Sequence, residues 1–240
     1  MGESQLEQVE SDELSYVPYK AFDTLLQSGL TTELRAEVFA AYARINIFYS
    51  IARAWSGHIG TCFSSVDIMT WLFLEKMSGL DQGQDQSDIF FSSKGHDAPA
   101  LYTVLTGLGL LDFELLHGLR RVEGLAGHPH VETPFIQANT GSLGMGISKA
   151  KGIATAQRLL GRRRRIFVLT GDGELQEGQI WESLGSAAQL GFDEITVIVD
   201  HNKIQSDTWV EQVGALGDLE AKFSSFGWRA ARCDGHDFCA

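Results

Sequence analysis

The stretch that decides the fold is Ile166-Phe167-Val168-Leu169-Thr170-Gly171-Asp172-Gly173, together with Ile195-Thr196-Val197-Ile198-Val199-Asp200-His201-Asn202 farther along the chain. Each is a short apolar run that ends in small or polar residues, as a buried β-strand does where it reaches a turn. The stretch between them has a helical pattern, so the unit is β-α-β and its two strands are parallel. In open parallel sheets ligands bind beyond the carboxyl ends of the strands, which is where Asp172 and Asn202 lie if the strands are neighbours.

Asp172 and Asn202 offer hard oxygen ligands, of the kind that Mg²⁺ accepts when it is held against a diphosphate. Gly171 and Gly173 have no side chains, so the backbone of this turn can approach phosphate oxygens, and the helix that follows offers unpaired N–H groups. A lone Gly-Asp-Gly is more often an ordinary tight turn. The Asn at the end of the next strand shifts the balance to a Mg²⁺–diphosphate site.

A set of motifs surrounds these strand ends: Gly171-Asp172-Gly173-Glu174-Leu175-Gln176-Glu177-Gly178, Trp181-Glu182 and Asp200-His201-Asn202-Lys203-Ile204. Five further motifs follow one order along the chain: Gly57-His58, Ser93-Lys94-Gly95-His96, Gly127-His128-Pro129, Thr140-Gly141-Ser142-Leu143-Gly144 and Asp234-Gly235-His236-Asp237. Together they resemble the thiamine diphosphate-binding part of the transketolase family. The resemblance covers the chain from about residue 30 to its end.

The resemblance implies a three-layer α/β/α fold with a mostly parallel central sheet, the thiamine diphosphate-binding fold. Residues 31–240 would form the diphosphate-binding (PP) domain without its distal end, and residues 1–30 would form an acidic N-terminal arm. In the family, an acid from a neighbouring pyrimidine-binding domain activates the cofactor, and no stretch of this chain resembles that domain. We therefore expect either the N-terminal subunit of a split transketolase, which we favour, or a piece of a longer enzyme.

The resemblance also implies the residues that would contact the cofactor. Asp172, Asn202 and the backbone carbonyl of Ile204 would ligate Mg²⁺. The other implied cofactor contacts are His96 beside the diphosphate and thiazolium, Gly173 and Asn202 at the diphosphate, and Gly141, Ser142 and Leu143 against the aminopyrimidine ring.

Four residues match catalytic positions of the family. His58 and His128 would bind the hydroxyl and carbonyl oxygens of a ketose donor, and His96 would lie beside the reacting ring. Glu177, with Glu182, matches interface acids that connect the two active sites of a dimer. Each lone histidine could equally be a core or surface residue that makes one hydrogen bond.

The implied reaction is transfer of a two-carbon ketol unit from a ketose or ketose phosphate to an aldose or aldose phosphate. The expected partner is a pyrimidine-binding, C-terminal transketolase subunit, in a heterotetramer with two copies of each chain. Gly-His-Ile-Gly-Thr at residues 57–61 and Ser-Asp-Thr-Trp-Val at residues 206–210 depart from the family pattern and leave sugar specificity open. Alternatives are a deoxyxylulose-phosphate-synthase-like or 2-oxo acid dehydrogenase-like thiamine enzyme, or a non-catalytic scaffold subunit.

The composition argues against some classes of binding partner and indicates a cellular compartment. Asp and Glu number 31 against 19 Lys and Arg, a formal charge of −12, which argues against nucleic acid and anionic membranes. The sequence shows neither an apolar run of membrane-spanning length nor a signal peptide, so the cytoplasm is expected. The three cysteines, Cys62, Cys233 and Cys239, form no C-x-x-C pair or even disulfide set, which agrees with a reducing compartment.

Two other kinds of site find weaker support. A zinc site built from His58, His96, His128 and His130 lacks the close ligand spacing of structural zinc sites. Cys62 as a nucleophile is also a weaker reading than a buried free thiol.

Apolar periodicity predicts a helix from Thr31 to about Ser56 and a short strand near residues 89–92. Ser64, with Asp67 three residues on, resembles a capping box that would open the next helix. A last strand is expected near residues 229–233.

Overall fold

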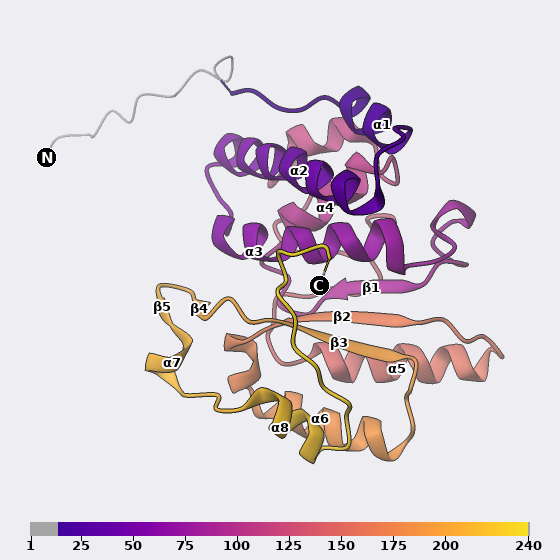
Figure 1. Ribbon diagram of the computed structural model, residues 1–240, viewed down its shortest axis with the longest axis vertical. Helices are drawn as coiled ribbons and strands as arrows, with labels where there is room; N and C mark the ends of the chain where they lie inside the picture. Colours follow the sequence, from indigo (N-terminus) through magenta and orange to yellow (C-terminus); the bar gives the residue numbers. More distant parts are fainter. Residues whose placement is uncertain (1–13, 240) are drawn as a thin grey trace, which may run out of the picture.

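The computed structural model describes residues 14–239 (Figure 1). Its α-helices are α1 (Tyr19–Leu26), α2 (Thr32–Ala54), α3 (Ile59–Trp71), α4 (Ala98–Gly107), α5 (Gly146–Leu159), α6 (Gly178–Gln189), α7 (Val210–Val213) and α8 (Leu219–Ser225). Its strands are β1 (Ile89–Ser92), β2 (Ile166–Gly171), β3 (Ile195–Asp200), β4 (Ile204–Gln205) and β5 (Thr208–Trp209). A π-helical turn follows α3 (Leu72–Lys76), and short 3₁₀ helices lie at Leu80–Gln82, Phe113–Gly118 and Gly173–Gln176.

The central sheet has the order β1-β2-β3, and both of its strand pairs are parallel. Gly171 at the end of β2 lies opposite Asp200 at the end of β3. The carboxyl ends of the two strands therefore form one rim, as the sequence predicts. Directly after β3 the chain forms a small antiparallel hairpin, in which Ile204 pairs with Trp209.

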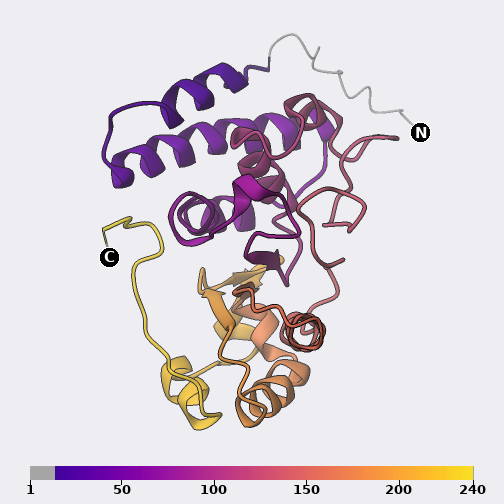
Figure 2. The same ribbon diagram turned by 90° about the vertical axis from the view of Figure 1, so that its right-hand side faces the viewer.

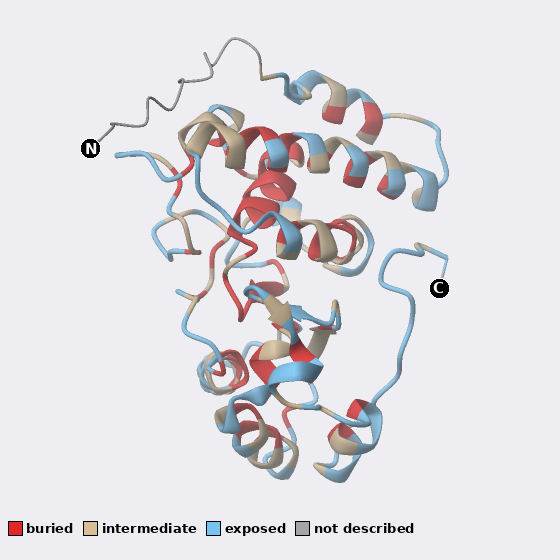
Figure 3. Ribbon diagram, turned by 90° about the vertical axis from the view of Figure 1, so that its left-hand side faces the viewer, coloured by how far each residue is buried: buried red, intermediate tan, exposed pale blue. Residues whose placement is uncertain are grey.

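Helices cover both faces of the sheet (Figures 1 and 2). Successive side chains of a strand point to opposite faces. Phe90 and Leu169 accordingly belong to a core shared with α2, α3 and α4, whereas Phe91 and Val168 pack with alanines of α5 and α6. The expected three-layer α/β/α fold with a parallel central sheet is confirmed, and its buried residues line the inner sides of the helices (Figure 3).

The predicted long helix is confirmed as α2. The Thr31 hydroxyl accepts a hydrogen bond from the Leu34 N–H and so caps the first turn. At the other end Trp55 takes a left-handed conformation (φ 53°), which stops the helix before the Gly57-His58 loop. The strand expected near residues 89–92 is also confirmed, as β1.

Two local predictions are wrong. The helix α3 begins after His58, and Ser64 lies inside it instead of capping it. The reason is a tertiary contact, because the Ser64 hydroxyl donates to Asp200 Oδ2 at 2.6 Å.

The second error is the strand expected at residues 229–233, where the structure has no strand. That segment runs from α8 towards α3 in Figure 1. It is fixed at its far end by His236, whose Nδ1 lies 2.6 Å from Asp67 Oδ2 on α3. A cavity of about 1050 Å³ separates it from β3, so no ladder of hydrogen bonds forms between them.

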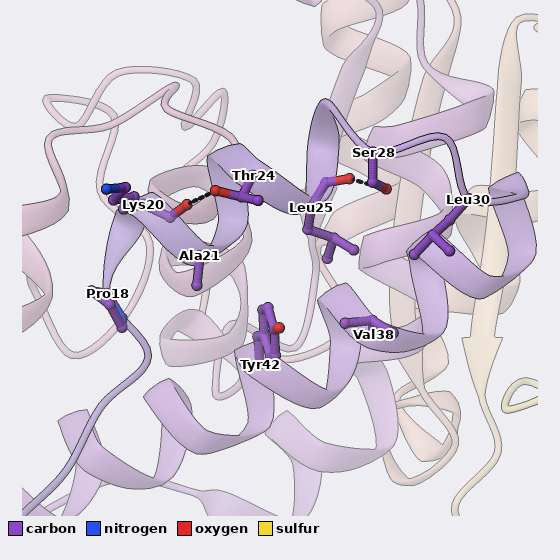
Figure 4. Close-up of a pocket in the computed structure, with 9 residues that line it drawn as sticks. All are labelled: Pro18, Lys20, Ala21, Thr24, Leu25, Ser28, Leu30, Val38 and Tyr42. Carbon is purple, nitrogen blue, oxygen red and sulfur yellow. Dashed lines mark hydrogen bonds between the residues drawn. The ribbon is translucent and has the colours of Figure 1, made fainter.

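The expected N-terminal arm contains an ordered helix. Residues 1–13 lie outside the described residues, but α1 follows them and buries Phe22 against Phe39 of α2, with ring centroids 5.0 Å apart. Between α1 and α2 lies an open hollow lined by Leu25, Val38 and Tyr42, among others (Figure 4). It includes none of the expected site residues, and the division of the chain at residue 30 stays a prediction.

Among residues 14–239, no helix combines the length and the apolar character that crossing a membrane requires.

Candidate active site

Asp172 follows β2 and is held at the rim of the sheet. Its side chain is buried, with Oδ1 accepting from the Gly173 N–H at 2.7 Å and Oδ2 accepting from the Lys203 N–H at 2.6 Å. Lys203 is the neighbour of Asn202, so this second bond ties the end of β2 to the turn after β3. Burial raises the pKa of Asp172, and the two N–H donors partly oppose that rise.

Asn202 lies in the same turn and is oriented on both sides of its amide. Its Oδ1 accepts from the Ile204 N–H at 2.9 Å, and its Nδ2 donates to the Ser64 hydroxyl at 3.1 Å. The end of β2 and this turn thus bring together a carboxylate and an amide oxygen, to which the resemblance adds the backbone carbonyl of Ile204. All three are hard oxygen donors, so the residues present fit a Mg²⁺ ion.

Gly173 departs from its expected role in one respect. Its N–H, which the resemblance assigns to the diphosphate, donates to Asp172 Oδ1 instead. A Cβ at Gly173 would approach the Gln205 side chain to 2.5 Å, so the absence of a side chain does matter at this turn.

Three histidines meet above the end of β1. His58 is the residue before α3, His96 follows β1, and His128 comes from the loop before α5. The ring centroid of His96 lies 4.9 Å from that of His58 and 5.0 Å from that of His128, both in edge-to-face geometry. The Tyr102 hydroxyl donates to the His128 carbonyl at 3.1 Å and so fixes the backbone of that loop.

The backbone at Gly141 lies between Gly95, the residue before His96, and the ring of His128. A Cβ added to Gly95 would lie 2.7 Å from the Gly141 nitrogen, and one added to Gly141 would lie 2.7 Å from Cδ2 of His128. Side chains are therefore excluded from both positions, and each has a positive φ that glycine tolerates. The next two residues of the motif, Ser142 and Leu143, are exposed and available to a ligand.

Glu174 connects the parts of the site, although its sequence position assigned it no role. Its buried carboxylate accepts from the Ser93 hydroxyl, from the Gly144 N–H at 2.8 Å and from the Gly171 N–H at 3.2 Å. One side chain therefore joins the ends of β1 and β2 to the glycine-rich loop. Burial raises the pKa of Glu174, and these donors work in the opposite direction.

The expected interface acids lie apart from this network. Glu177 and Glu182 are both exposed, at the start and in the second turn of α6. Within residues 14–239 the Glu177 carboxylate makes no hydrogen bond or ion pair, although a Cβ at Gly144 would touch its Cβ at 2.8 Å. Their part in an interface stays a prediction.

The alternative sites find no support in the described part of the chain. Across residues 14–239, no three His, Cys, Asp or Glu side chains converge as a metal-binding group, and His130 is exposed. Burial raises the pKa of the Cys62 thiol to about 12, so Cys62 carries no thiolate at neutral pH.

Arg120→Gln is expected to raise the pKa values of His58 and His128. Burial is the main cause that lowers both pKa values, and the electrostatic influence of the neighbouring His96 ring and of the Arg120 guanidinium lowers them further. Without the guanidinium, each imidazole should accept a proton at higher pH. An NMR titration of the histidine Cε1–H signals measures both values.

Arg121→Gln is the matched control, because the Arg121 guanidinium donates instead to the Arg53 carbonyl at 2.9 Å. Unchanged or lower pKa values for His58 and His128 in Arg120→Gln would contradict the electrostatic account. The sign for stability follows from the same shifts. Because folding lowers the pKa values of His58 and His128, the folded chain binds fewer protons at these two residues than the unfolded chain. Their contribution to the free energy of unfolding is therefore complete above the unfolded pKa and is lost as pH falls through the folded values.

The sequence model of the transketolase thiamine diphosphate-binding domain matches residues 36–240. An apulose-4-phosphate transketolase chain of Actinobacillus succinogenes is 36% identical over 185 residues, which cover 75% of this chain and 67% of the relative. The 6-deoxy-6-sulfo-D-fructose transketolase subunit SqwG of a Clostridium species is 35% identical over 192 residues, covering 78% and 70%. Human transketolase is 34% identical over 197 residues, but they cover only 32% of that protein.

Solved transketolase structures share the fold. The enzyme from Leishmania mexicana aligns with a TM-score of 0.71 and 26% identity over 89% of this chain and 31% of that one. The enzyme from Campylobacter jejuni aligns with a TM-score of 0.70 and 29% identity over 80% and 32%. The chain thus spans about a third of the full-length transketolases that it matches. It belongs to the transketolase family and carries that family's thiamine diphosphate-binding domain.

Proposed function

We propose that this chain is the cofactor-holding subunit of a two-subunit transketolase. With a pyrimidine-binding subunit it would transfer a two-carbon ketol unit from a ketose or ketose phosphate to an aldose or aldose phosphate. The observation that carries the proposal is the meeting of Asp172 and the Asn202 turn at one rim, through the bond from the Lys203 N–H to Asp172. A carboxylate and an amide oxygen placed there suit a Mg²⁺ ion that neutralises a diphosphate.

In this proposal Asp172, Asn202 and the Ile204 carbonyl would hold a Mg²⁺ ion, which would neutralise charge on the diphosphate. Thiamine diphosphate, when bound, supplies the carbon nucleophile that no protein side chain offers. The protein contributes position and charge. Asp172 accepts one N–H at each oxygen and still has lone pairs for a cation.

The histidines would act on the donor sugar. Because burial lowers the pKa values of His58 and His128, both imidazoles are neutral at neutral pH. A neutral imidazole donates from one nitrogen and accepts at the other, so it can hold or move a proton at a ketose hydroxyl or carbonyl oxygen. His96 Nδ1 donates to the Lys94 carbonyl, which fixes the orientation of the ring and turns its Nε2 edge away from that bond.

A partner subunit is part of the proposal. Three relatives are themselves named as single subunits of larger enzymes, two of an apulose-4-phosphate transketolase and one of a sulfofructose transketolase. We infer a heterotetramer with two copies of each chain, in which Glu177 and Glu182 lie at the interface between active sites. The free thiols Cys62, Cys233 and Cys239 agree with assembly in the reducing cytoplasm.

Calorimetric titration with thiamine diphosphate and MgCl₂ tests the proposal. It is made on the full chain, alone and together with the pyrimidine-binding subunit, and it is repeated with EDTA. We expect Mg²⁺-dependent binding that strengthens with the partner, because the partner would cover the aminopyrimidine end of the cofactor. Absence of binding in both cases would favour a scaffold subunit without catalytic function.

A further inference from the structure

A buried lysine lies directly behind the proposed metal rim. Lys94 follows β1, and its side chain is only 6% exposed. Its Nζ donates to Asp200 Oδ2 at 2.6 Å and to the Thr61 hydroxyl at 2.8 Å, and it lies 3.5 Å from Asp97 Oδ2. Burial alone disfavours an ammonium ion. Here the two carboxylates outweigh burial and raise the pKa of Lys94, so the charged form persists.

Asp200 connects Lys94 to Asn202 through hydrogen bonds to one shared oxygen. The same oxygen, Oδ2, accepts from Lys94, from the Ser64 hydroxyl at 2.6 Å and, more weakly, from Asn202 Nδ2 at 3.4 Å. Ser64 in turn accepts from Asn202 Nδ2 at 3.1 Å. The amide nitrogen of Asn202 therefore has two acceptors on the side that faces Lys94.

The direction of that amide decides whether the rim can bind a cation. An Asn side chain carries an oxygen on one arm and two N–H donors on the other, and a half-turn about its last bond exchanges them. In the observed direction Asn202 Oδ1 accepts from the Ile204 N–H, within the same turn whose Lys203 N–H donates to Asp172. In the opposite direction the amide would present N–H donors to Mg²⁺, which repels them.

We propose that Lys94 is a positioning residue, which holds Asp200 and Ser64 as acceptors so that Asn202 presents its oxygen to the metal. The inference rests on the proposed function, because the proposed function supplies the Mg²⁺ ion that the Asn202 oxygen would bind. It explains why a lysine is buried among carboxylates just after β1. The ends of β2 and β3 carry the proposed metal ligands, and the end of β1 carries none. Lys94 touches neither the metal nor the substrate in this role.

Lys94→Met tests the inference, with Asp97→Asn as the matched control. Methionine keeps the length of the side chain but donates no hydrogen bond, so Asp200 loses its strongest partner. Asp97 contacts Lys94 from the other side, and its change alters the same buried cluster without breaking the path to Asn202. Ser64→Ala removes one acceptor and leaves every charge in place, which provides a milder variant should Lys94→Met fold poorly.

The first measurement needs no cofactor. The Asn202 side-chain NH₂ signals in a ¹⁵N-correlated NMR spectrum, assigned through Asn202→Asp, should shift or broaden in Lys94→Met and Ser64→Ala. They should remain close to wild type in Asp97→Asn. Unmoved Asn202 signals in both test variants would overturn the positioning role.

The second measurement is the affinity for thiamine diphosphate with Mg²⁺, on the full chain with its partner subunit. Residues that orient a metal ligand typically change metal affinity by about 10-fold to 100-fold, and we expect a loss in that range for Lys94→Met. Lys94→Arg should recover part of it, because it restores a charged donor. An equal loss in Asp97→Asn would overturn the inference. Failure of the wild-type chain to bind would instead reject the proposed function, while the Asn202 signals would still decide the role of Lys94.

Discussion

Asp172→Ala abolishes the Mg²⁺-dependent binding of thiamine diphosphate: this is the largest effect that we expect from any single substitution in the chain. Asp172 is the only carboxylate among the three oxygen ligands proposed for the metal. Asn202 and the Ile204 carbonyl are neutral, so without Asp172 no charged ligand remains to hold a dication beside a diphosphate. The affinity should fall by more than about 100-fold, beyond the range seen when residues behind the ligands change.

The substitution has a structural cost that the experiment must separate from the loss of metal. The Gly173 and Lys203 N–H groups would lose their acceptor; a fully buried donor left unpaired costs about 1–3 kcal/mol, and these partly buried donors would cost less because water can reach them. Asp172→Asn keeps an oxygen for one of these donors while it removes the charge. Calorimetry with and without EDTA, together with thermal unfolding of each variant, separates the two effects.

Asp193→Ala is the matched control, because it removes an aspartate at the same sheet but away from the rim. Asp193 is exposed and pairs with Arg163 just before β3 begins, at the opposite end of the strand from the rim. It should bind the cofactor as the wild-type chain does. Undiminished Mg²⁺-dependent affinity in both Asp172 variants would remove Asp172 from the metal site and would leave the family fold without its proposed chemistry.

The meeting of Asp172 and the Asn202 turn at one rim could be predicted from the sequence because it depends on strand ends. The runs before Asp172 and Asn202 are apolar without alternation, as strands covered on both faces require, and each run stops at residues that favour a turn. Parallel neighbours then bring both ends to one edge without further information. The structure confirms that register, with Gly171 opposite Asp200.

The supporting network could not be predicted, because its contacts join distant parts of the chain. The Ser93–Glu174 bond spans 81 positions, and the Lys94–Asp200 bond spans 106. Nothing in the local pattern around Glu174 or Lys94 distinguishes a buried charge from a solvated one. Burial of both becomes visible only when β1, β2 and β3 are assembled.

Ser64 shows how such a contact overrides a local pattern. Its spacing to Asp67 suits a capping box, but its partner Asp200 lies 136 positions away and the helix begins earlier, after His58. The strand prediction at residues 229–233 was wrong for a related reason. A strand requires an edge with which to pair, and here the segment lies across a cavity from β3.

His128→Ala has the second largest expected effect. It should lower turnover much more than it weakens cofactor binding. The His128 ring stands beside His96, and its partly buried, neutral imidazole can exchange a proton with a donor oxygen. General acid–base groups of this kind contribute about 100-fold to 10,000-fold in rate. We expect kcat of the assembled enzyme to fall by about 100-fold, at the lower limit of that range, because His58 and His96 remain.

His130→Ala is a close control, since His130 lies two residues on in the same loop and is exposed. It should leave kcat and cofactor affinity unchanged. The His128 ring also packs on Gly141, so its removal opens space beside the proposed aminopyrimidine contact. His128→Gln fills part of that space and keeps a hydrogen-bond donor, so it should retain cofactor affinity while still lacking a group that titrates.

The division between kcat and cofactor affinity separates two roles for His128. A proton-transfer role lowers kcat in both His128→Ala and His128→Gln, and it also removes the acidic limb of the pH–rate profile that His128 causes when it is protonated. Because burial lowers the pKa of His128, that limb should lie below the pH at which an exposed histidine titrates. If both variants instead lose cofactor affinity in proportion to rate, the ring serves to support the Gly141 loop, and donor chemistry must be assigned to His58 and His96.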